Sequence, residues 1–231
     1  MYLKKCIVTA VAVLLLVSTC TTSCGSAQQN GKGCLGEWFD KAGFVENMDE
    51  DAYLGLLDDI TCDEKKITEI APYVGFGSYG NGGFSASCSD FKYGYEYAQG
   101  SPSVIVYYLS YSVEIRGFEL PYQIKPGDGL EGVTQAFGYT DLDYSSFAEQ
   151  SKITGMLLLK SDGAERIVLR ERSVNDAQTT YLYPIELIYT EEYTLSHSGV
   201  QSAVKRSLCL AFSNGPSPTL RQVTVTVSEE Y

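Results

Sequence analysis

The chain has 231 residues and a formal net charge of −12, from 17 Lys and Arg against 29 Asp and Glu, with a single histidine. This acidity argues against a nucleic-acid-binding surface, which needs clustered cations. One histidine, His197, lies in a polar segment without a nucleophile motif and is expected in a surface loop, so a Ser–His–Asp hydrolase is disfavoured.

The first residues predict an export signal. Two lysines precede an apolar run over residues 6–17, which is too short to span a bilayer. Small residues follow, and two processing sites remain open. Signal peptidase I could cut after Ala27 and release a secreted protein. Alternatively, the segment resembles a bacterial lipoprotein signal, in which Cys24, or else Cys20, would carry the lipid.

The lipoprotein interpretation divides the chain into three parts. Residues 1–24 are the signal peptide (to about 27 if signal peptidase I acts), residues 25–33 form a flexible tether, and residues 34–231 form a single domain. Removal of the two leader lysines changes the charge from −12 to −14. Membrane attachment would therefore depend on the lipid rather than on attraction to anionic headgroups. The expected location is the cell envelope, on the periplasmic or the surface side.

Seven cysteines are present, and four remain after the leader and the lipid acceptor are removed. They are Cys34, Cys62, Cys88 and Cys209. In an exported chain they predict two disulfides, with three pairings open. No two of them form a C-x-x-C pair and histidine partners are missing, so neither a metal site nor a cofactor is expected.

Helical spacing is confined mainly to residues 34–72. Asp49 is expected to cap a helix whose apolar side chains recur at three- and four-residue intervals. These apolar side chains are Tyr53, Leu56, Leu57 and Ile60. A second short helix is expected over residues 63–71, because Pro72 would end it.

From residue 84 the pattern changes to a period of two. Phe91, Tyr93, Tyr95 and Tyr97 share one face of a predicted strand, either as core or as an aromatic surface that stacks on sugars or a partner. The strongest strand pattern covers residues 103–116. Further strands are expected over residues 153–160, 166–172, 180–189, 204–213 and 220–227. Pro184 favours either an edge position or a bulge for the third of these.

These patterns together predict an α+β fold. We expect a mainly antiparallel β-sheet with a few short helices packed on one face, stabilised by disulfides.

One strand–turn–helix unit interrupts the strands at residues 118–141. Pro126 and Gly127 form the turn, and Asp128 is expected to cap a short helix that ends at Gly138. The helix should bury Leu130, Val133 and Phe137.

The same stretch, LPYQIKPGDGLEGVTQAFGYTD, resembles a pattern in small exported α+β modules. Examples are outer-membrane assembly lipoproteins of the SmpA/OmlA type and β-lactamase-inhibitor-protein-like domains. The corresponding residues are Gly127, Asp128, Glu131, Val133, Phe137 and Gly138. The resemblance implies helices packed on an antiparallel sheet and a protein-binding or scaffold role. It identifies no catalytic residue.

The leading hypothesis is therefore a non-catalytic binding or scaffold module for a protein or glycan at the cell envelope. The alternative is a carboxylate-dependent hydrolase of envelope or extracellular carbohydrate. The acidic residues available to it are Asp128, Asp141, Asp143, Glu191 and Glu192. A third hypothesis is an inhibitor-like protein whose acidic surface meets a basic partner.

Overall fold

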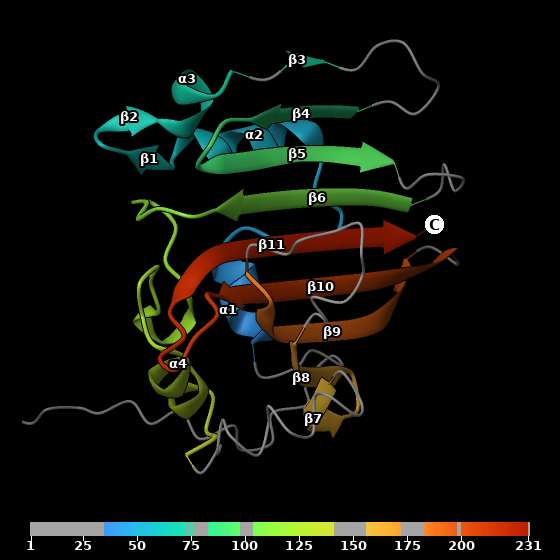
Figure 1. Ribbon diagram of the computed structural model, residues 1–231. Helices are drawn as coiled ribbons and strands as arrows, with labels where there is room; N and C mark the ends of the chain where they lie inside the picture. The colour runs from blue at the N-terminus through green and yellow to red at the C-terminus, as the bar shows by residue number, and fades with distance from the viewer. Residues whose placement is uncertain are drawn as a thin grey trace, which may run out of the picture.

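A computed structural model describes residues 35–72, 74–75, 83–97, 104–140, 156–171, 183–197 and 200–230. Nine strands form one antiparallel sheet in the order β3-β4-β5-β6-β11-β10-β9-β8-β7 (Figure 1). The prediction of a mainly antiparallel sheet with a few short helices is confirmed.

The strands of the sheet are β3 (Val74–Gly75), β4 (Gly83–Ser87), β5 (Phe91–Tyr97), β6 (Val104–Tyr111), β7 (Met156–Asp162), β8 (Glu165–Glu171), β9 (Ile185–His197), β10 (Val200–Phe212) and β11 (Leu220–Glu230). The described helices are α1 (Gly36–Lys41), α2 (Glu50–Asp58), α3 (Ile67–Ile70), the 3-10 turn η1 (Pro121–Gln123) and α4 (Leu130–Ala136). A separate two-stranded hairpin consists of β1 (Thr61–Cys62) and β2 (Lys65–Lys66).

Helices α1 and α2 lie on one face of the sheet, which we call the helix face (Figure 1). Alternate residues of each strand point to this face and form the core. The ring centroid of Phe39 in α1 lies 6.0 Å from that of Tyr189 in β9, and the ring of Tyr53 in α2 lies 5.1 Å from that of Tyr107 in β6. Burying such a side chain stabilises the fold by about 1.5–3 kcal/mol.

The predicted start of α2 is confirmed. The Asp49 side chain accepts a hydrogen bond from the backbone N–H of Ala52 at 2.8 Å, and Tyr53 and Leu57 are buried. The next helix is shorter than predicted. Asp63 and Glu64 both have positive φ and form the β1–β2 turn, so the chain cannot enter a helix until Ile67.

A tyrosine hydroxyl is inserted between two strands of the sheet. Gly94 of β5 lies opposite Tyr108 of β6, and the Gly94 N–H donates to the Tyr53 hydroxyl at 3.0 Å. The same hydroxyl donates to the Tyr108 carbonyl. The phenol thus joins the two backbone groups and fixes α2 on the sheet.

Two predictions about β9 are wrong. Pro184 precedes β9, which lies between β8 and β10 in the interior of the sheet rather than at an edge. Because the proline stands before the first paired residue, Ile185, it removes no hydrogen bond from the ladder. The strand continues to His197, which was expected in a loop.

No helix in the described part of the chain is long and apolar enough to span a membrane. The predicted leader and tether, residues 1–33, lie outside the described residues.

Replacing Tyr53 with Phe removes the hydroxyl and leaves the Gly94 N–H and the Tyr108 carbonyl without this partner. We expect a loss of about 1–3 kcal/mol in the free energy of unfolding, measured by urea denaturation. Tyr95→Phe is the control, because its hydroxyl donates to the exposed Glu50, and should cost less than about 1 kcal/mol. Equal losses in the two variants would contradict the proposed link.

Candidate functional site

The most buried charges of the described residues surround Arg206 in β10. Its side chain and that of Glu191 in β9 are both 0% exposed, and the two residues face each other across the strands. Arg206 donates to Glu191 Oε2 from Nη2 at 2.6 Å and from Nε at 2.9 Å, and to Asp40 Oδ1 of α1 at 2.7 Å. Burial lowers the pKa of Arg206, but Glu191 and Asp40 outweigh it and leave the pKa above its usual value. The guanidinium therefore stays charged.

Aromatic rings enclose the same guanidinium. Its central carbon lies 4.9 Å from the ring centroid of Phe39 and 5.4 Å from that of Tyr193. The Tyr193 hydroxyl donates to Glu46 at 2.9 Å. Cation–π contacts of this kind are stronger where water is excluded. They complete the environment that makes a buried cation tolerable.

A third carboxylate, Glu229 of β11, also binds the segment that follows α1. It accepts hydrogen bonds from the backbone N–H of Asn47 and from the hydroxyl of Ser202, each at 2.9 Å. Contacts at Asp40 of α1 and at Glu46 and Asn47 of the segment that follows it therefore fasten this part of the chain to three neighbouring strands. We call this set of contacts the N-terminal latch.

Two carboxylates do lie side by side on the sheet, as a carbohydrate hydrolase would require. Glu165 of β8 is paired in register with Glu191 of β9. However, Glu165 is 7% exposed and forms an ion pair with Lys160 and a 2.7 Å hydrogen bond with the Tyr189 hydroxyl. Since Glu165 and Glu191 each face their own cation, neither is placed as a proton donor or nucleophile toward a substrate.

The other acidic residues named for the hydrolase hypothesis have contacts within the fold wherever the structure describes them. Asp128 was expected to cap α4, but Gly129 occupies that position and no side chain caps the helix. The Asp128 carboxylate turns back and accepts from the Lys125 N–H at 2.9 Å, closing the preceding turn. Glu192 forms a surface ion pair with Lys205. Asp141 and Asp143 lie outside the described residues.

The aromatic stripe of β5 points toward the helix face. Phe91 and Tyr93 are 4% and 0% exposed, and the Tyr93 hydroxyl donates to the carbonyl of Ala71 just after α3. Tyr95 and Tyr97 are half-buried. The first two rings are part of the core, so the stripe does not form an exposed stacking surface along its whole length.

No disulfide is present in the described part of the chain, so the predicted disulfide framework is not supported there. Cys62 lies in β1, Cys88 precedes β5 and Cys209 lies in the middle of β10, while Cys34 is outside the described residues. The physical reason is that a nine-stranded sheet buries an extensive aromatic core, and disulfides are most needed where the core is small.

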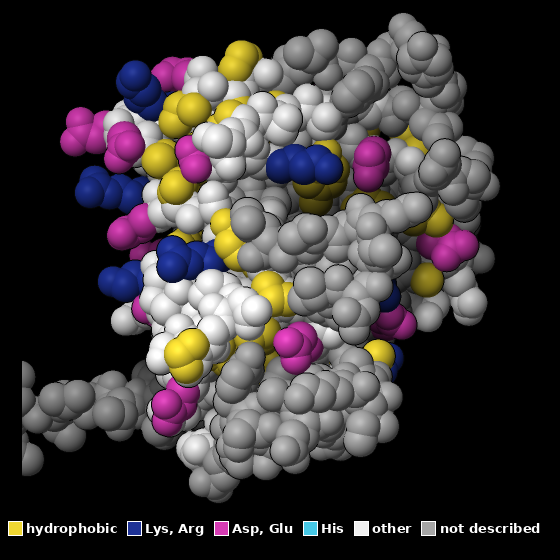
Figure 2. Space-filling view, viewed as in Figure 1, with side chains coloured by type: hydrophobic (Ala, Val, Ile, Leu, Met, Phe, Trp, Pro, Cys, Tyr) yellow, Lys and Arg dark blue, Asp and Glu magenta, His cyan; other side chains and the backbone are white. Residues whose placement is uncertain are grey.

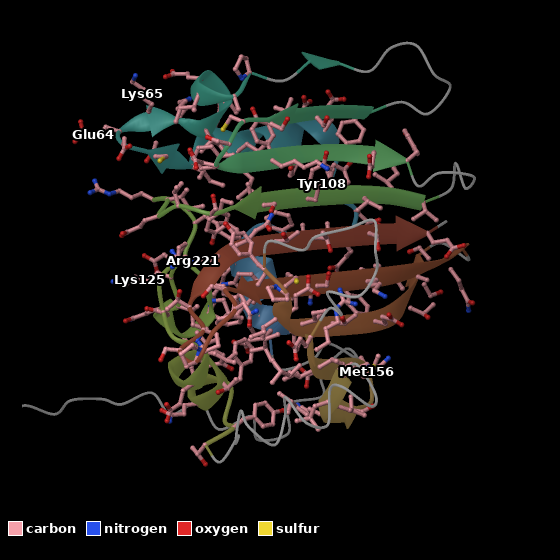
Figure 3. The ribbon with its side chains drawn as sticks, in the orientation of Figure 1. Glu64, Lys65, Tyr108, Lys125, Met156 and Arg221 are labelled. Atoms are coloured by element: carbon pink, nitrogen blue, oxygen red, sulfur yellow. The ribbon has the colours of Figure 1, made fainter. Side chains whose placement is uncertain are left out.

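On the face of the sheet opposite the helices, polar side chains contact one another. Tyr108, labelled in Figure 3, is 8% exposed and has the Lys92 Nζ 5.2 Å from its ring centroid. Burial raises the pKa of Tyr108, while a hydrogen bond with Ser85 lowers it. Nearby, the hydroxyls of Ser110 and Thr224 are 2.9 Å apart. On the same face, ion pairs join Arg170 of β8 to Glu186 of β9 and Lys205 of β10 to Glu192 of β9.

An exposed aromatic residue stands out at residues 118–124. Tyr122 is 42% exposed, whereas Phe118, Leu120 and Ile124 around it are buried. Tyr122 and Gln123 have φ of 60° and 58°, a left-handed conformation that costs roughly 1–3 kcal/mol each for non-glycine residues. The buried neighbours hold this strained turn in place.

Two further contacts fix the turn. Trp38 Nε1 donates to the carbonyl of Glu119 at 2.9 Å, and the ring of Tyr122 meets that of Phe137 edge-to-face with centroids 5.2 Å apart. Neither residue of this turn is a glycine or an asparagine, the residue types that indicate positive φ in a sequence. Only the alternation of buried and exposed positions around Tyr122 could have drawn attention to it.

Among the described residues, no cluster of three or more His, Cys, Asp or Glu side chains could hold a metal ion. Comparison with family models, curated proteins and solved structures found no match for this chain.

Replacing Arg206 with Met leaves Glu191 buried without its cation. We expect the free energy of unfolding to fall by about 3–5 kcal/mol in urea denaturation. The double variant Arg206→Met/Glu191→Leu removes both charges and should recover much of this loss. If the double variant instead loses the sum of the two single losses, the residues are not coupled.

Three buried or partly buried tyrosines with raised pKa values lead us to expect a loss of stability at alkaline pH. Burial raises the pKa of Tyr53, Tyr111 and Tyr193 well above the usual value near 10. Each group therefore holds its proton more tightly when folded, and unfolding releases protons once the pH exceeds about 10. Stability contributed by these groups is complete below pH 10 and declines above it.

The measurement is the melting temperature between about pH 8 and 11.5, together with absorbance at 295 nm. The tyrosinate signal of these residues should rise only as the protein unfolds. Their ionisation near pH 10 in a protein that keeps its near-ultraviolet circular dichroism would contradict this account. Tyr193→Phe should make the decline less steep.

Proposed function

We propose that the protein is an exported cell-envelope lipoprotein that acts as a non-catalytic binding or scaffold module for a protein or glycan. The sequence of the leader, with Cys24 or Cys20 as lipid acceptor, supports the anchor. The local resemblance of residues 118–141 to small exported binding modules accords with the role. The observation that most supports a binding role is Tyr122, an exposed ring on a strained turn whose neighbours are buried.

Such a turn suits binding for an energetic reason. An aromatic side chain offers a large contact area with only two rotatable bonds, and a fixed backbone loses little entropy on association. Strained left-handed backbone at non-glycine residues persists only where the surrounding structure enforces it, and it clusters at functional sites. Tyr122 meets both conditions, because its turn is held by Phe118, Leu120 and Ile124.

The N-terminal latch supports the role of the anchor. The nine residues 25–33 would form a chain with a root-mean-square span of roughly 15–18 Å. Helix α1 follows almost directly and is joined to β10 by the Asp40–Arg206 ion pair. A lipid at the start of the tether would therefore keep the whole sheet close to the membrane surface.

The hydrolase alternative gains no support from the described carboxylates. Glu165 and Glu191 are each engaged by a cation, and Asp128 closes a turn.

The lipid anchor is tested by the mass of the mature N-terminus after expression in a bacterial host. We expect a diacyl or triacyl mass on Cys24, or on Cys20, and recovery of the protein in the membrane fraction. Cys24→Ser should release it to the soluble fraction if Cys24 is the acceptor, with Cys20→Ser as the matched control. An unmodified N-terminus at Gln28 would overturn the lipoprotein assignment.

A further inference from the structure

The turn between β10 and β11 contains an asparagine followed by a glycine. The two ends of the turn are fixed, because the Ser213 N–H donates to the Thr219 carbonyl at 2.9 Å and the Thr219 N–H donates to Ser213 Oγ at 3.1 Å. Asn214 and Gly215 lie between these ends, outside both strands, and Asn214 is exposed. Water therefore reaches the side-chain amide in the folded protein.

The backbone nitrogen of Gly215 contacts the Asn214 side chain directly. It donates to Asn214 Oδ1 at 2.8 Å. Because a C=O bond is about 1.2 Å long, this nitrogen lies within about 4 Å of the Asn214 Cγ. A small rotation of the exposed side chain brings the two atoms to the separation of about 3–3.5 Å from which they can react.

Gly215 leaves room for this approach. It has no side chain, and its φ is 122°. In the described part of the chain, no atom beyond its immediate neighbours lies within 4 Å of the position that a Cβ would take. Glycine is the residue type that permits such a close approach of the backbone.

The other side chains that invite comparison lack this contact. Asp128 also precedes a glycine, but its carboxylate accepts from the Lys125 N–H at 2.9 Å. Asn47 is the other asparagine of the described residues, and it precedes Met48, whose side chain is 7% exposed. The arrangement at residues 214–215 therefore depends on the local structure as well as on the residue pair.

We propose that Asn214 deamidates spontaneously in the folded protein, through a cyclic imide closed by the Gly215 nitrogen. A bond forms between that nitrogen and Asn214 Cγ, and the bond from Cγ to the side-chain nitrogen breaks. The side-chain nitrogen leaves as ammonia, with the proton that Gly215 loses. Water then opens the ring. Attack at Cγ gives aspartate, whereas attack at the backbone carbonyl gives isoaspartate, in which the main chain runs through Cγ.

Both products add one negative charge, and isoaspartate also adds one carbon to the backbone. Arg221, labelled in Figure 3 shortly after the turn, lies on an edge where Figure 2 shows acidic and basic side chains interspersed, so the charge alone should cost little. The added backbone atom matters more, because the Pro218 carbonyl accepts from the Leu130 N–H at 2.9 Å and Thr219 is bridged to Gly129. Isoaspartate would therefore disturb the attachment of α4 to this turn.

The test is peptide mapping of the full mature chain after incubation at neutral and at mildly alkaline pH. Trypsin cleavage after Arg206 and Arg221 releases residues 207–221, in which Asn214 is the sole asparagine. We expect two products of this peptide, each heavier by the replacement of –NH2 with –OH. They should form faster as the pH rises, because the attacking nitrogen must lose its proton.

A synthetic peptide of residues 207–221 is the reference. Asn214 in the folded protein should convert within about threefold of the rate in this peptide, or faster, since the fold holds the reacting atoms together. Asn47 is the internal control, because it is the sole asparagine of the tryptic peptide 42–65 and should not convert over the same period. The Asn–Gly pairs at residues 30–31 and 81–82, which lie outside the described residues, fall in other tryptic peptides.

Asn214→Gln is the matched variant, because attack on its side chain would have to close a six-membered ring, and its peptide should keep its mass. The proposal is overturned if Asn214 converts more than about threefold more slowly in the folded protein than in the peptide, since the turn would then protect it. It is also overturned if Asn47 converts as fast as Asn214, because the loss of ammonia would then not depend on the Gly215 contact.

Discussion

The fold depends on the buried ion pair between Arg206 and Glu191. A charge without water is costly unless its hydrogen-bonding groups find partners, and Arg206 has them in Glu191, Asp40 and the rings of Phe39 and Tyr193. Arg206 and Glu191 meet within the sheet, on β10 and β9, whereas Asp40 belongs to α1, so the contact of Arg206 with Asp40 forms only when the first helix is docked on the sheet. It specifies one position of α1 against a sheet that would otherwise offer an unspecific apolar surface.

The N-terminal latch would connect the proposed membrane anchor to the sheet. In an exported and lipid-anchored protein, any force on the tether would reach α1 first, and the contacts of Asp40, Glu46 and Asn47 would pass it to β9, β10 and β11. The turn that precedes α4 is joined to β11 by the hydrogen bonds of Leu220 with Gly127 and Asp128. The latch and this turn thus contact the same strand, β11.

Periodicity predicted much of the fold because each strand buries one face. The strand over residues 91–97 and the helix over residues 130–136 follow directly from the spacing of their apolar residues. The polar network could not be predicted, since Glu191 and Arg206 are 15 residues apart in sequence and meet only through the register of β9 and β10. The left-handed turn at Tyr122 has no signal in the sequence for a similar reason, since its conformation is imposed by tertiary packing and not by a glycine. The sequence predicts Asp128 as a cap because it cannot show which way a turn carboxylate points.

The account is tested most directly by hydrogen–deuterium exchange of the α1 amides in the wild-type protein and in Arg206→Met. The amides of Phe39 and Ala42, which donate to the carbonyls of Leu35 and Trp38, should be protected nearly as well as those of β10 in the wild type, and they should lose protection in the variant while β5 and β6 keep theirs. Rapid exchange of α1 in the wild type, or unchanged protection in the variant, would show that Arg206 does not hold the helix on the sheet.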